Sequence, residues 1–529
     1  MTLFHAGDTI INGHQPFVYA VCPEYTVDYC SYCLQPIHPN DNCEESVLSC
    51  PQCRFSRYCS AQCWEYGSKD HEYICTLVTS LPDNTEIQTD LLLLAKILRK
   101  LEYGNFYDAS ENINSCPKPN KQPRSFFDLI SHKQEIHKDV SRMAELETWY
   151  TTVADVLEPS LEHVLAFTCT NQNLSLTRPK REVTFGDPFD LFVDIMGKLQ
   201  CNAFSILDGF LNKVAEGLYL EASVFDHACG SARNAHYFFD GTGLYVKAFK
   251  DIQSFSDVRI SYVDCFVPPL IRQHKLQNRY YFACRCRMCA DPETVSEIFA
   301  IKCGTPGCGG TVPLPGLANA DHDDNVSSKG EILKDKRSDQ EVVLTEKNLV
   351  ACSKCQLCPT LSMVLESRAL TEDHLLMHTE ICLSSEDADA DKKLFSTETG
   401  SFAENRRHLE CYEMMLADEI DLLHSTNFLR GLTFEAAGRW YLALPHSRPN
   451  TVKALEYLLE SLKAQRKFFS KNDPTIALLL IDIADLQKQC DQTQSASATM
   501  EEARDILNTV ENRDSPCLSL ASKILQDLH

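Results

Sequence analysis

The sequence predicts an α+β protein built from metal sites, short strands and an all-helical C-terminal region. Three observations lead to this fold class. Cysteine and histidine pairs with the spacing of metal ligands crowd into residues 30–75. Short stretches of alternating apolar and polar residues, which are typical of strands, occur in residues 1–29 and 201–289. From residue 402 to the end, apolar residues recur at the spacing of helix faces.

Length and charge limit the classes of function. The chain has 529 residues, a length that fits about two to four domains. It carries 50 Lys and Arg against 74 Asp and Glu, a formal net charge of -24, which opposes binding to nucleic acid or to an anionic membrane. The most apolar run, Leu91 to Leu98, is interrupted by Lys96 and is too short to span a bilayer.

Cysteine usage indicates a reducing compartment. The chain has 26 cysteines, and the polar stretch from Met1 to Asp8 does not look like a secretory signal. We therefore expect cysteine to serve as a metal ligand rather than in disulfides, and both nucleus and cytoplasm fit.

Residues 30–75 are expected to form a zinc finger. Its four ligand pairs are Cys30 with Cys33, Cys50 with Cys53, Cys59 with Cys63, and His71 with Cys75. Eight soft ligands are enough for two tetrahedral zinc ions. A segment with so few apolar residues cannot bury a sufficient core, so metal has to supply its stability. The alternative is a disulfide scaffold, which requires a secretory context that the sequence does not indicate.

Helices are expected between the finger and residue 200. Residues Thr89–Tyr103 have apolar positions at helical spacing, a Thr or Asp cap, and Lys and Arg in the last turn. Residues 126–166 and 188–199 are also predicted to be helical, and loop-like stretches separate them.

The chain then shifts toward short strands. The clearest are Val246–Phe249 and Val258–Val263, which polar turns separate. We expect these two strands to pair as a hairpin or meander.

Cysteines again occur at metal-ligand spacing after these strands. The first group is the Cys-x-Cys-x2-Cys trio Cys284, Cys286 and Cys289. Two further pairs follow, which are Cys303 with Cys308 and Cys352 with Cys355. They flank a polar insert, 318–343, that we expect to be a disordered loop.

The C-terminal region is predicted to be helical throughout, after an acidic linker at 384–392. Helices are expected near 404–423, 427–443, 451–468, 474–489, 494–511 and 516–528. Asp473 and Pro474 form a capped helix start. Antiparallel helix pairs of this length suggest a tetratricopeptide-like array, and we expect residues 402–529 to fold alone.

The cysteine-rich segment resembles the MYND zinc finger. The resemblance rests on Tyr58-Cys59, on the seven-residue gap between Cys63 and His71, and on the closing His-x3-Cys. In that family the pairs interleave. The resemblance therefore implies one zinc on Cys30, Cys33, Cys59 and Cys63, and a second on Cys50, Cys53, His71 and Cys75.

The middle of the chain is similar to the split SET domain of the SET and MYND domain family. The resemblance rests on four segments, which are "CNAFSI" from Cys201, "GLYLEASVFDHAC" ending at Cys229, "ISYVD" around Tyr262 and "YYFACRCRMC" ending at Cys289. The resemblance covers nearly the whole chain and implies seven parts. They are the start of the SET domain (1–29), the MYND finger (30–75), a helical insert (76–200), the SET core (201–270), a post-SET segment with a possible zinc knuckle (271–360), a linker (361–401) and the tetratricopeptide-like domain (402–529).

The family implies methylation of lysine on histones or other proteins, with S-adenosylmethionine as methyl donor. Tyr262 matches the catalytic tyrosine, and Tyr280 matches an aromatic residue of the lysine channel. Phe282 matches an aromatic residue of the cofactor pocket. A lysine amine, with a reference pKa of about 10.4, has to lose its proton before it can attack, so a fixed phenol that orients the amine suits the chemistry.

Other cofactor contacts are matched less completely. Cys201 and Asn202 match a cofactor-binding pair. The family's Asn-His-Ser-Cys loop is Asp226-His227-Ala228-Cys229 here. Ile130 and His132 stand where the family offers Glu and Asn, and the usual Gly-rich opening before His5 is absent from this sequence. We therefore expect weak cofactor binding.

The resemblance also implies further zinc. Cys229, Cys284, Cys286 and Cys289 match the family's third site. A fourth zinc on Cys303, Cys308, Cys352 and Cys355 is left open, because the loop between the pairs is long and Cys358 could compete.

Two functions compete at this stage, and direct nucleic-acid binding is a minor third. One is a zinc-containing protein-lysine methyltransferase. The other is an interaction scaffold on a decayed SET domain. In the scaffold, the finger would bind proline-containing peptides and the helical domain would bind chaperones or other proteins.

Overall fold

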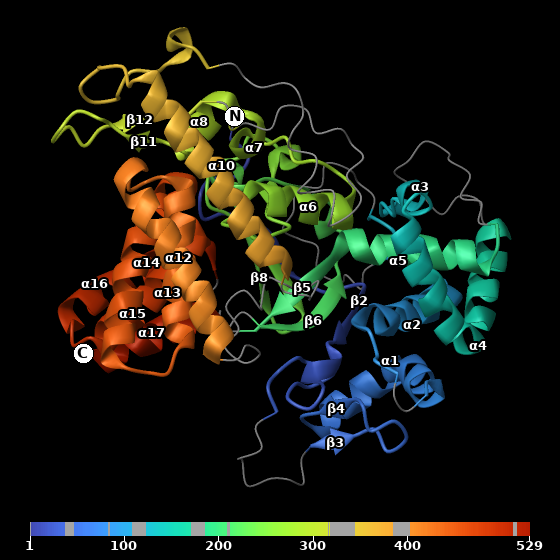
Figure 1. Cartoon of the computed structure of the whole chain (residues 1–529). Coiled ribbons are helices and arrows are strands. Elements are labelled where there is room, and N and C mark those ends of the chain that lie inside the picture. The colour runs from blue at the N-terminus through green and yellow to red at the C-terminus, as the bar shows by residue number, and fades with distance from the viewer. Residues whose placement is uncertain are drawn as a thin grey trace.

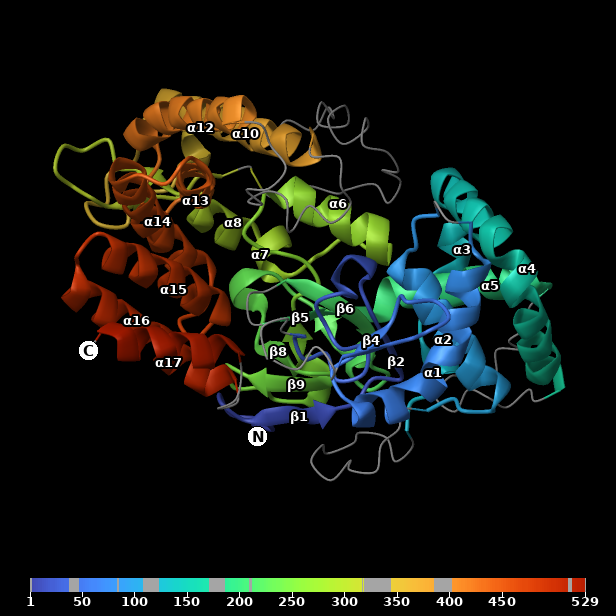
Figure 2. The same cartoon turned by 90° about the horizontal axis from the view of Figure 1, so that it is seen from below.

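The computed structural model describes residues 2–37, 47–82, 85–107, 123–170, 186–208, 212–315, 317, 344–384, 402–511 and 516–528. Short strands lie at the centre, with the C-terminal helices on one side and the helices of the insert on the other (Figure 1). The same arrangement is visible from below (Figure 2). The fold is therefore α+β with an all-helical C-terminal region, as the sequence predicts.

Two three-stranded antiparallel sheets combine the N-terminal segment with the middle of the chain. One has the order β1 (Thr9–His14), β9 (Gly243–Ala248) and β8 (Ala235–Asp240). The other has the order β2 (Val18–Val21), β6 (Lys213–Leu218) and β5 (Ala203–Leu207). Alternating residues of both sheets enclose a small apolar core that includes Ile10, Ile206 and Val246. The two sheets thus place residues 9–21 against strands more than 180 positions away.

The predicted hairpin between Val246–Phe249 and Val258–Val263 is wrong. Both edges of β9 are occupied, by β1 and β8. The second segment forms only β10 (Arg259–Ile260), which pairs in parallel with β7 (Asp226–His227). A strand with two partners has no free hydrogen-bonding edge for a third, so β10 has to pair elsewhere.

The finger consists of a small hairpin and a helix. The hairpin is β3 (Leu48–Ser49) with β4 (Arg57–Tyr58), and the helix is α1 (Ala61–Ser80). The Ser60 side chain accepts a hydrogen bond from the backbone of Cys63 and caps α1. This cap fixes the helix start beside the candidate ligands Cys59 and Cys63.

A second core forms where the finger helix meets the helical insert. The insert contains α2 (Thr89–Glu102), α3 (Lys133–Ile136), α4 (Val140–Thr170) and α5 (Pro188–Asn202). The residues of α2 from Leu91 to Ala95 are all buried in this core. Helix α5 begins with the Asp187 cap and Pro188 at its first position and ends at Asn202, so Cys201 and Asn202 are helical.

The segment expected to be post-SET, called the post-SET segment below, is a string of short helices and one hairpin. It comprises α6 (Pro269–Tyr280), α7 (Arg287–Ala290), α8 (Pro292–Ile298), β11 (Ile301–Lys302) and β12 (Thr311–Val312).

Six short 3-10 turns lie elsewhere among the described residues, at Pro23–Tyr25, Phe126–Asp128, Ala222–Val224, Gly230–Ala232, Phe255–Asp257 and Glu346–Asn348. The insert expected to be disordered, 318–343, lies outside the described residues.

The predicted linker 361–401 needs correction in its first part. Residues Leu361–Ser384 form the helix α10, and only 385–401 lie outside the described residues. Helix α10 packs against α6, α12 and α13. The sequence did not show this because the buried face of α10 carries polar residues, among them Ser367, Thr371 and His378.

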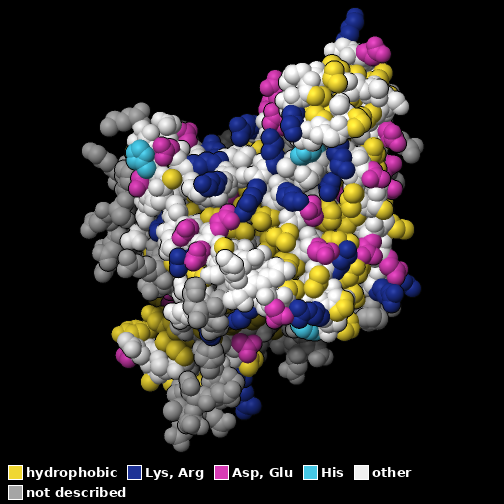
Figure 3. All heavy atoms as spheres, turned by 90° about the vertical axis from the view of Figure 1, so that its left-hand side faces the viewer, with side chains coloured by type: hydrophobic (Ala, Val, Ile, Leu, Met, Phe, Trp, Pro, Cys, Tyr) yellow, Lys and Arg dark blue, Asp and Glu magenta, His cyan; other side chains and the backbone are white. Residues whose placement is uncertain are grey.

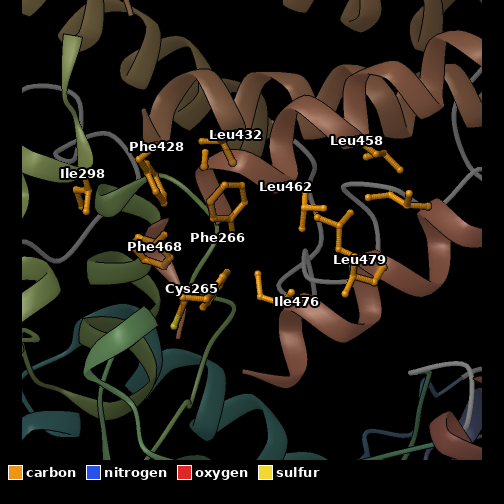
Figure 4. Packing of buried hydrophobic residues seen from close by; sticks show 14 of the residues in the cluster. Cys265, Phe266, Ile298, Phe428, Leu432, Leu458, Leu462, Phe468, Ile476 and Leu479 are labelled. Carbon is orange, nitrogen blue, oxygen red and sulfur yellow. The ribbon is translucent and has the colours of Figure 1, made fainter. Parts of the chain in front are cut away.

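The C-terminal helices follow the predicted order. They are α12 (Phe402–Leu422), α13 (Phe428–Ala443), α14 (Arg448–Phe468), α15 (Pro474–Gln489), α16 (Thr493–Val510) and α17 (Pro516–Leu528). Consecutive helices pack on one another. Their core continues into the middle of the chain, where Cys265 and Phe266 lie among Phe428, Phe468 and Ile476 (Figure 4).

The surface on the side of the C-terminal helices is mixed in charge. Figure 3 shows Lys and Arg side chains interspersed with Asp and Glu, and hydrophobic side chains between them. None of the helices in the described part of the chain combines the length and apolar character that a membrane crossing requires.

Candidate functional site

Four cysteine-rich clusters could each hold a metal ion. In each one the candidate ligand atoms lie within 4.8 Å of one another. The first consists of Cys30, Cys33, Cys59 and Cys63, and the second of Cys50, Cys53, His71 and Cys75. The third consists of Cys229, Cys284, Cys286 and Cys289, and the fourth of Cys303, Cys308, Cys352 and Cys355. These are the ligand groups expected from the sequence, and the interleaving of the finger pairs is present.

The spacing of the sulfur atoms fits zinc. Neighbouring Sγ atoms within the clusters lie 3.5–3.7 Å apart. A tetrahedral zinc with Zn–S bonds of about 2.3 Å needs sulfur atoms about 3.8 Å apart. A disulfide would need about 2.05 Å. The donor chemistry and the spacing therefore suit zinc and exclude disulfides within these clusters.

His71 is oriented for metal through its Nε2 atom. Nε2 lies 3.3 Å from Cys53 Sγ, and Nδ1 lies 3.0 Å from the Ser56 hydroxyl. The Ser56 oxygen can accept the Nδ1 proton, which leaves the Nε2 lone pair for a metal. Burial, assisted by Lys96, lowers the pKa of His71 to about 4, so the imidazole is neutral, as a ligand has to be.

The third cluster is assembled from distant parts of the chain and is deeply buried. Cys229 follows β7 and is completely buried, while the trio comes from the start of the post-SET segment. The backbone N–H of Cys229 donates to Cys286 Sγ at 3.5 Å, which ties the two segments together. Arg272 lies beside this cluster and is 1% exposed. It donates to the carbonyls of Cys265 and Val267.

The fourth cluster brings together the two cysteine pairs whose zinc site the sequence left open. Cys358 is exposed and belongs to no ligand cluster among the described residues. Cys352 is buried, and its backbone forms hydrogen bonds with Leu357 and Gln356 that shape the knuckle. The two pairs meet although the insert lies between them in sequence.

Tyr262 lies in a group of aromatic side chains just after β10. Its ring centroid is 4.8 Å from that of Tyr280, 5.4 Å from His227 and 6.4 Å from Phe282. Its hydroxyl donates to the Phe225 carbonyl at 2.5 Å. Burial, followed by the nearby Asp226, raises the pKa of Tyr262 above its usual value, so the hydroxyl keeps its proton near neutral pH.

The other candidate cofactor residues divide into two groups. His227 and Phe282 lie beside Tyr262, with their own ring centroids 6.3 Å apart. Asn202 is buried, and its side-chain amide donates to the carbonyls of Ile130 and Lys198. Cys201 approaches the carbonyl of Arg279. Thus residues 130, 201–202 and 279 form one contact group, and residues 227, 262 and 282 form another.

Asp226 and Ile130 are both open to solvent. The Asp226 side chain is 72% exposed and forms a long ion pair of 3.6 Å with Arg259. Ile130 is 45% exposed, which is unusual for its side chain. His132 adopts a left-handed backbone conformation (φ 50°) and its ring lies 5.4 Å from that of Tyr281, also left-handed (φ 55°). Strained residues of this kind concentrate at functional sites.

Three residues of the site were not found from the sequence. They are Phe225, whose carbonyl accepts from Tyr262, and the buried residues Cys265 and Arg272. Backbone carbonyls carry no sequence signal. Cys265 lies three positions after Tyr262 and belongs to none of the predicted ligand groups, which could have marked it as a candidate site residue.

Comparisons with known proteins agree with this architecture. The chain is 25% identical to the histone-lysine N-methyltransferase SMYD3 of Mus musculus over 279 residues, 52% of this chain and 54% of the relative. The human SMYD3 is 26% identical over the same length. The N-lysine methyltransferase SMYD2 of Gallus gallus is 23% identical over 291 residues, 53% of this chain and 56% of the relative. No family model matches the chain.

An α+β chain with interleaved finger ligands and a helical C-terminal region is the architecture of a SET-type protein with an inserted MYND finger. Its relatives, at 22–26% identity over about half of the chain, support the SET and MYND domain-containing family. The match spans about half the length of these curated relatives.

Proposed function

We propose that this protein is a protein-lysine methyltransferase of the SET and MYND type. The observation that carries the proposal is the position of Tyr262. Its hydroxyl is held by the Phe225 carbonyl inside an aromatic group made by Tyr280, Phe282 and His227. Named relatives with lysine methyltransferase activity support the same reaction class.

Tyr262 would act as a positioned neutral hydroxyl. Because its proton is donated to the Phe225 carbonyl, the lone pairs of the oxygen stay free to accept from an N–H of the substrate amine. The rings of Tyr280 and Phe282 would line a narrow channel and exclude water around the amine. S-adenosylmethionine would supply an electrophilic methyl group on sulfur. Fixing the amine in line with that methyl lowers the barrier mainly through orientation.

The residues proposed to hold the cofactor are Cys201, Asn202, Asp226, His227 and Phe282, and Tyr280 would line the substrate channel. Three zinc ions would be structural in the first three clusters, and a fourth would occupy the zinc knuckle. We further propose protein substrates that carry the target lysine on a histone or another protein, and activity in nucleus and cytoplasm.

A scaffold function is the second candidate, and specific observations favour it. The side-chain amide of Asn202 is already committed to two protein carbonyls. Asp226 is exposed to solvent beside Arg259, and the side chain of Ile130 cannot accept a hydrogen bond. Each polar group of a ligand that leaves water without a partner costs about 1–3 kcal/mol. In this case the finger would bind proline-containing peptides, and the C-terminal helices, in a tetratricopeptide-like array, would bind a chaperone or other proteins.

Calorimetric titration of the full chain with S-adenosylmethionine separates the two candidates. A micromolar or tighter dissociation constant supports the enzyme. No binding at millimolar cofactor supports the scaffold. If two or three groups stay unpaired, affinity falls about 10²- to 10⁴-fold relative to an intact relative. The variant Asp226→Asn with Ile130→Glu should then recover part of it.

A methyl-transfer assay with tritiated donor on histones tests the role of Tyr262. Tyr262→Phe keeps the ring and removes the hydroxyl, and the rate should fall by about a hundredfold. Tyr219→Phe is a matched control, because the buried Tyr219 hydroxyl also donates to a backbone carbonyl, that of Thr242. An equal rate for the wild type and Tyr262→Phe would exclude the proposed role.

A further inference from the structure

Both nitrogens of the His227 imidazole have hydrogen-bond partners. Nδ1 lies 3.0 Å from the backbone nitrogen of Tyr262, and Nε2 lies 3.1 Å from Cys229 Sγ. His227 is buried on the two-residue strand β7, opposite Ile260 on β10. One side chain therefore connects a ligand of the third cluster with the main chain of the proposed catalytic tyrosine.

The two contacts determine which nitrogen carries the proton. A backbone N–H can only donate, so Nδ1 has to accept from Tyr262 and carries no proton. The proton of the imidazole is then on Nε2, which directs it at Cys229 Sγ. A metal-bound thiolate is a good acceptor for such a proton.

The position of this proton also argues against His227 as a metal ligand. His227, Cys229 and Cys265 also lie close enough together to be considered as a metal group. If Nε2 bound a metal, the neutral ring would have to carry its proton on Nδ1, where Tyr262 N–H already points. His227 is therefore a donor to the cluster and not a ligand of a second ion.

The third cluster is a rigid anchor for this connection. Cys229 is completely buried, and its Sγ lies 3.6 Å from Cys289 Sγ. The backbone of Ala228 donates to the Ile260 carbonyl at 3.0 Å, so β7 and β10 are also joined directly. Outer hydrogen bonds to metal ligands fix the orientation of both partners.

We propose that His227 is a positioning residue that sets the place of Tyr262 from the third metal cluster, through an Nε2–H···Sγ bond to Cys229 and an N–H···Nδ1 bond from Tyr262. The bond from His227 to Cys229 concerns the metal cluster alone. The effect of the bond from Tyr262 on catalysis rests on the proposed function. The post-SET cysteines would then contribute to catalysis by aligning the tyrosine, in addition to holding their own segment.

Two variants separate the two hydrogen bonds. His227→Asn places an amide oxygen near the position of Nδ1 and removes the donor to Cys229. His227→Gln places an amide nitrogen near the position of Nε2 and removes the acceptor for Tyr262. His236→Asn, on strand β8, is the matched control. The side-chain contacts of His236 within the described residues are with Tyr237, Phe238 and Glu511, and not with Tyr262 or the cluster.

The first measurement is metal retention of the full chain against a competing chelator, with ions counted by native mass spectrometry. His227→Asn should lose one zinc at about ten- to a hundredfold lower chelator activity than the wild type, and His227→Gln should stay near the wild type. Equal retention in all variants would overturn the metal-side bond. This readout needs no enzymatic activity.

The second measurement is amide hydrogen exchange of the full chain, read in the proteolytic fragment that contains Tyr262. Exchange should be faster in His227→Gln than in His227→Asn, because only the former leaves the N–H without its acceptor. If the wild type also methylates protein, kcat should fall more in His227→Gln than in His227→Asn, with KM alike in the two. Identical exchange in both variants would overturn the proposal, while absence of methyl transfer in the wild type would count against the proposed function only.

Discussion

The finger and the third cluster use the same kind of ligand but differ in what surrounds them. All finger ligands come from residues 30–75, and α1 packs the finger against α2 and α4. The third cluster joins Cys229 to a trio more than fifty positions later. It belongs to the large core that continues through the C-terminal helices. A metal in the finger would therefore organise one segment, whereas a metal in the third cluster would fasten several.

The aromatic packing beside the third cluster strengthens this contrast. Phe266 follows Cys265 and contacts Phe428 of α13 at a centroid distance of 5.0 Å. The Arg272 guanidinium lies 5.5 Å from the rings of both Phe428 and Phe468. The cluster, its arginine and the C-terminal helices are thus one packed unit.

The largest expected effect comes from removing a ligand of each cluster. Cys289→Ser should lower the melting temperature of the whole chain and expose the C-terminal helices, because the buried site anchors the shared core. Cys53→Ser should abolish metal at the second cluster, in the finger, but leave the main melting transition nearly unchanged. Calorimetry together with regional hydrogen exchange measures both. Equal losses for the two variants would contradict the contrast.

Chelation of the wild type offers the same comparison without mutation. Residues 30–75 should gain hydrogen exchange first, because this segment has the least core of its own. A simultaneous rise in hydrogen exchange around all clusters would mean that the surrounding structure stabilises the finger as strongly as the third cluster.

The next effect concerns buried charge. Arg272→Met keeps volume but removes the cation beside the thiolates of the third cluster, and stability should fall by about 3–5 kcal/mol. Arg99→Met in α2 is the counterpart near the finger, where the side chain pairs with the exposed Glu72 at 2.9 Å. An exposed pair contributes at most about 1 kcal/mol. Denaturant midpoints compare the two, and a loss at Arg272 no larger than at Arg99 would mean that the cluster does not require the cation.

The two regions also differ in how far the sequence could predict them. The finger ligands occur in short pairs, so local spacing was enough to propose two zinc sites. Nothing in the residues around Cys229 connects it to the trio, and its membership followed only from the resemblance to a family. Likewise, the pairing of β10 with β7 depends on which strand edges are already occupied, and this is a property of the whole sheet.

Helix α10 shows a different limit of sequence analysis. Its buried positions include His374, which contacts the fully buried Glu419 at 2.9 Å, and His378, which contacts Thr433 at 2.9 Å. Hydrophobic periodicity cannot detect a helix whose inner face is polar and satisfied by partners on other helices. The C-terminal helices have apolar inner faces, and their expected ranges differ from the structure by only a few residues.

A smaller effect should appear at Gly230, next to Cys229. Gly230 has φ +46°, and an added Cβ would lie 2.7 Å from the Phe468 ring. Gly104, after α2, has φ +70° and nothing within 4 Å of such a Cβ. Gly104→Ala should therefore cost only the backbone strain, about 1–2 kcal/mol. Gly230→Ala should cost about 1–3 kcal/mol more through overpacking. Equal denaturant midpoints would show that Phe468 gives way freely.

The smallest effect is expected at Cys358, and it tests whether the fourth cluster is complete. Cys358 is exposed and outside the cluster, whereas Cys355 Sγ lies 3.5 Å from Cys303 Sγ. Native mass spectrometry should count four zinc ions in the wild type and in Cys358→Ser, and three in Cys355→Ser. Little stability should be lost in Cys355→Ser, because Cys303, Cys308 and Cys355 are only partly buried and fasten one hairpin. Loss of a zinc ion in Cys358→Ser would instead mean that Cys358 replaces one of the four ligands in solution.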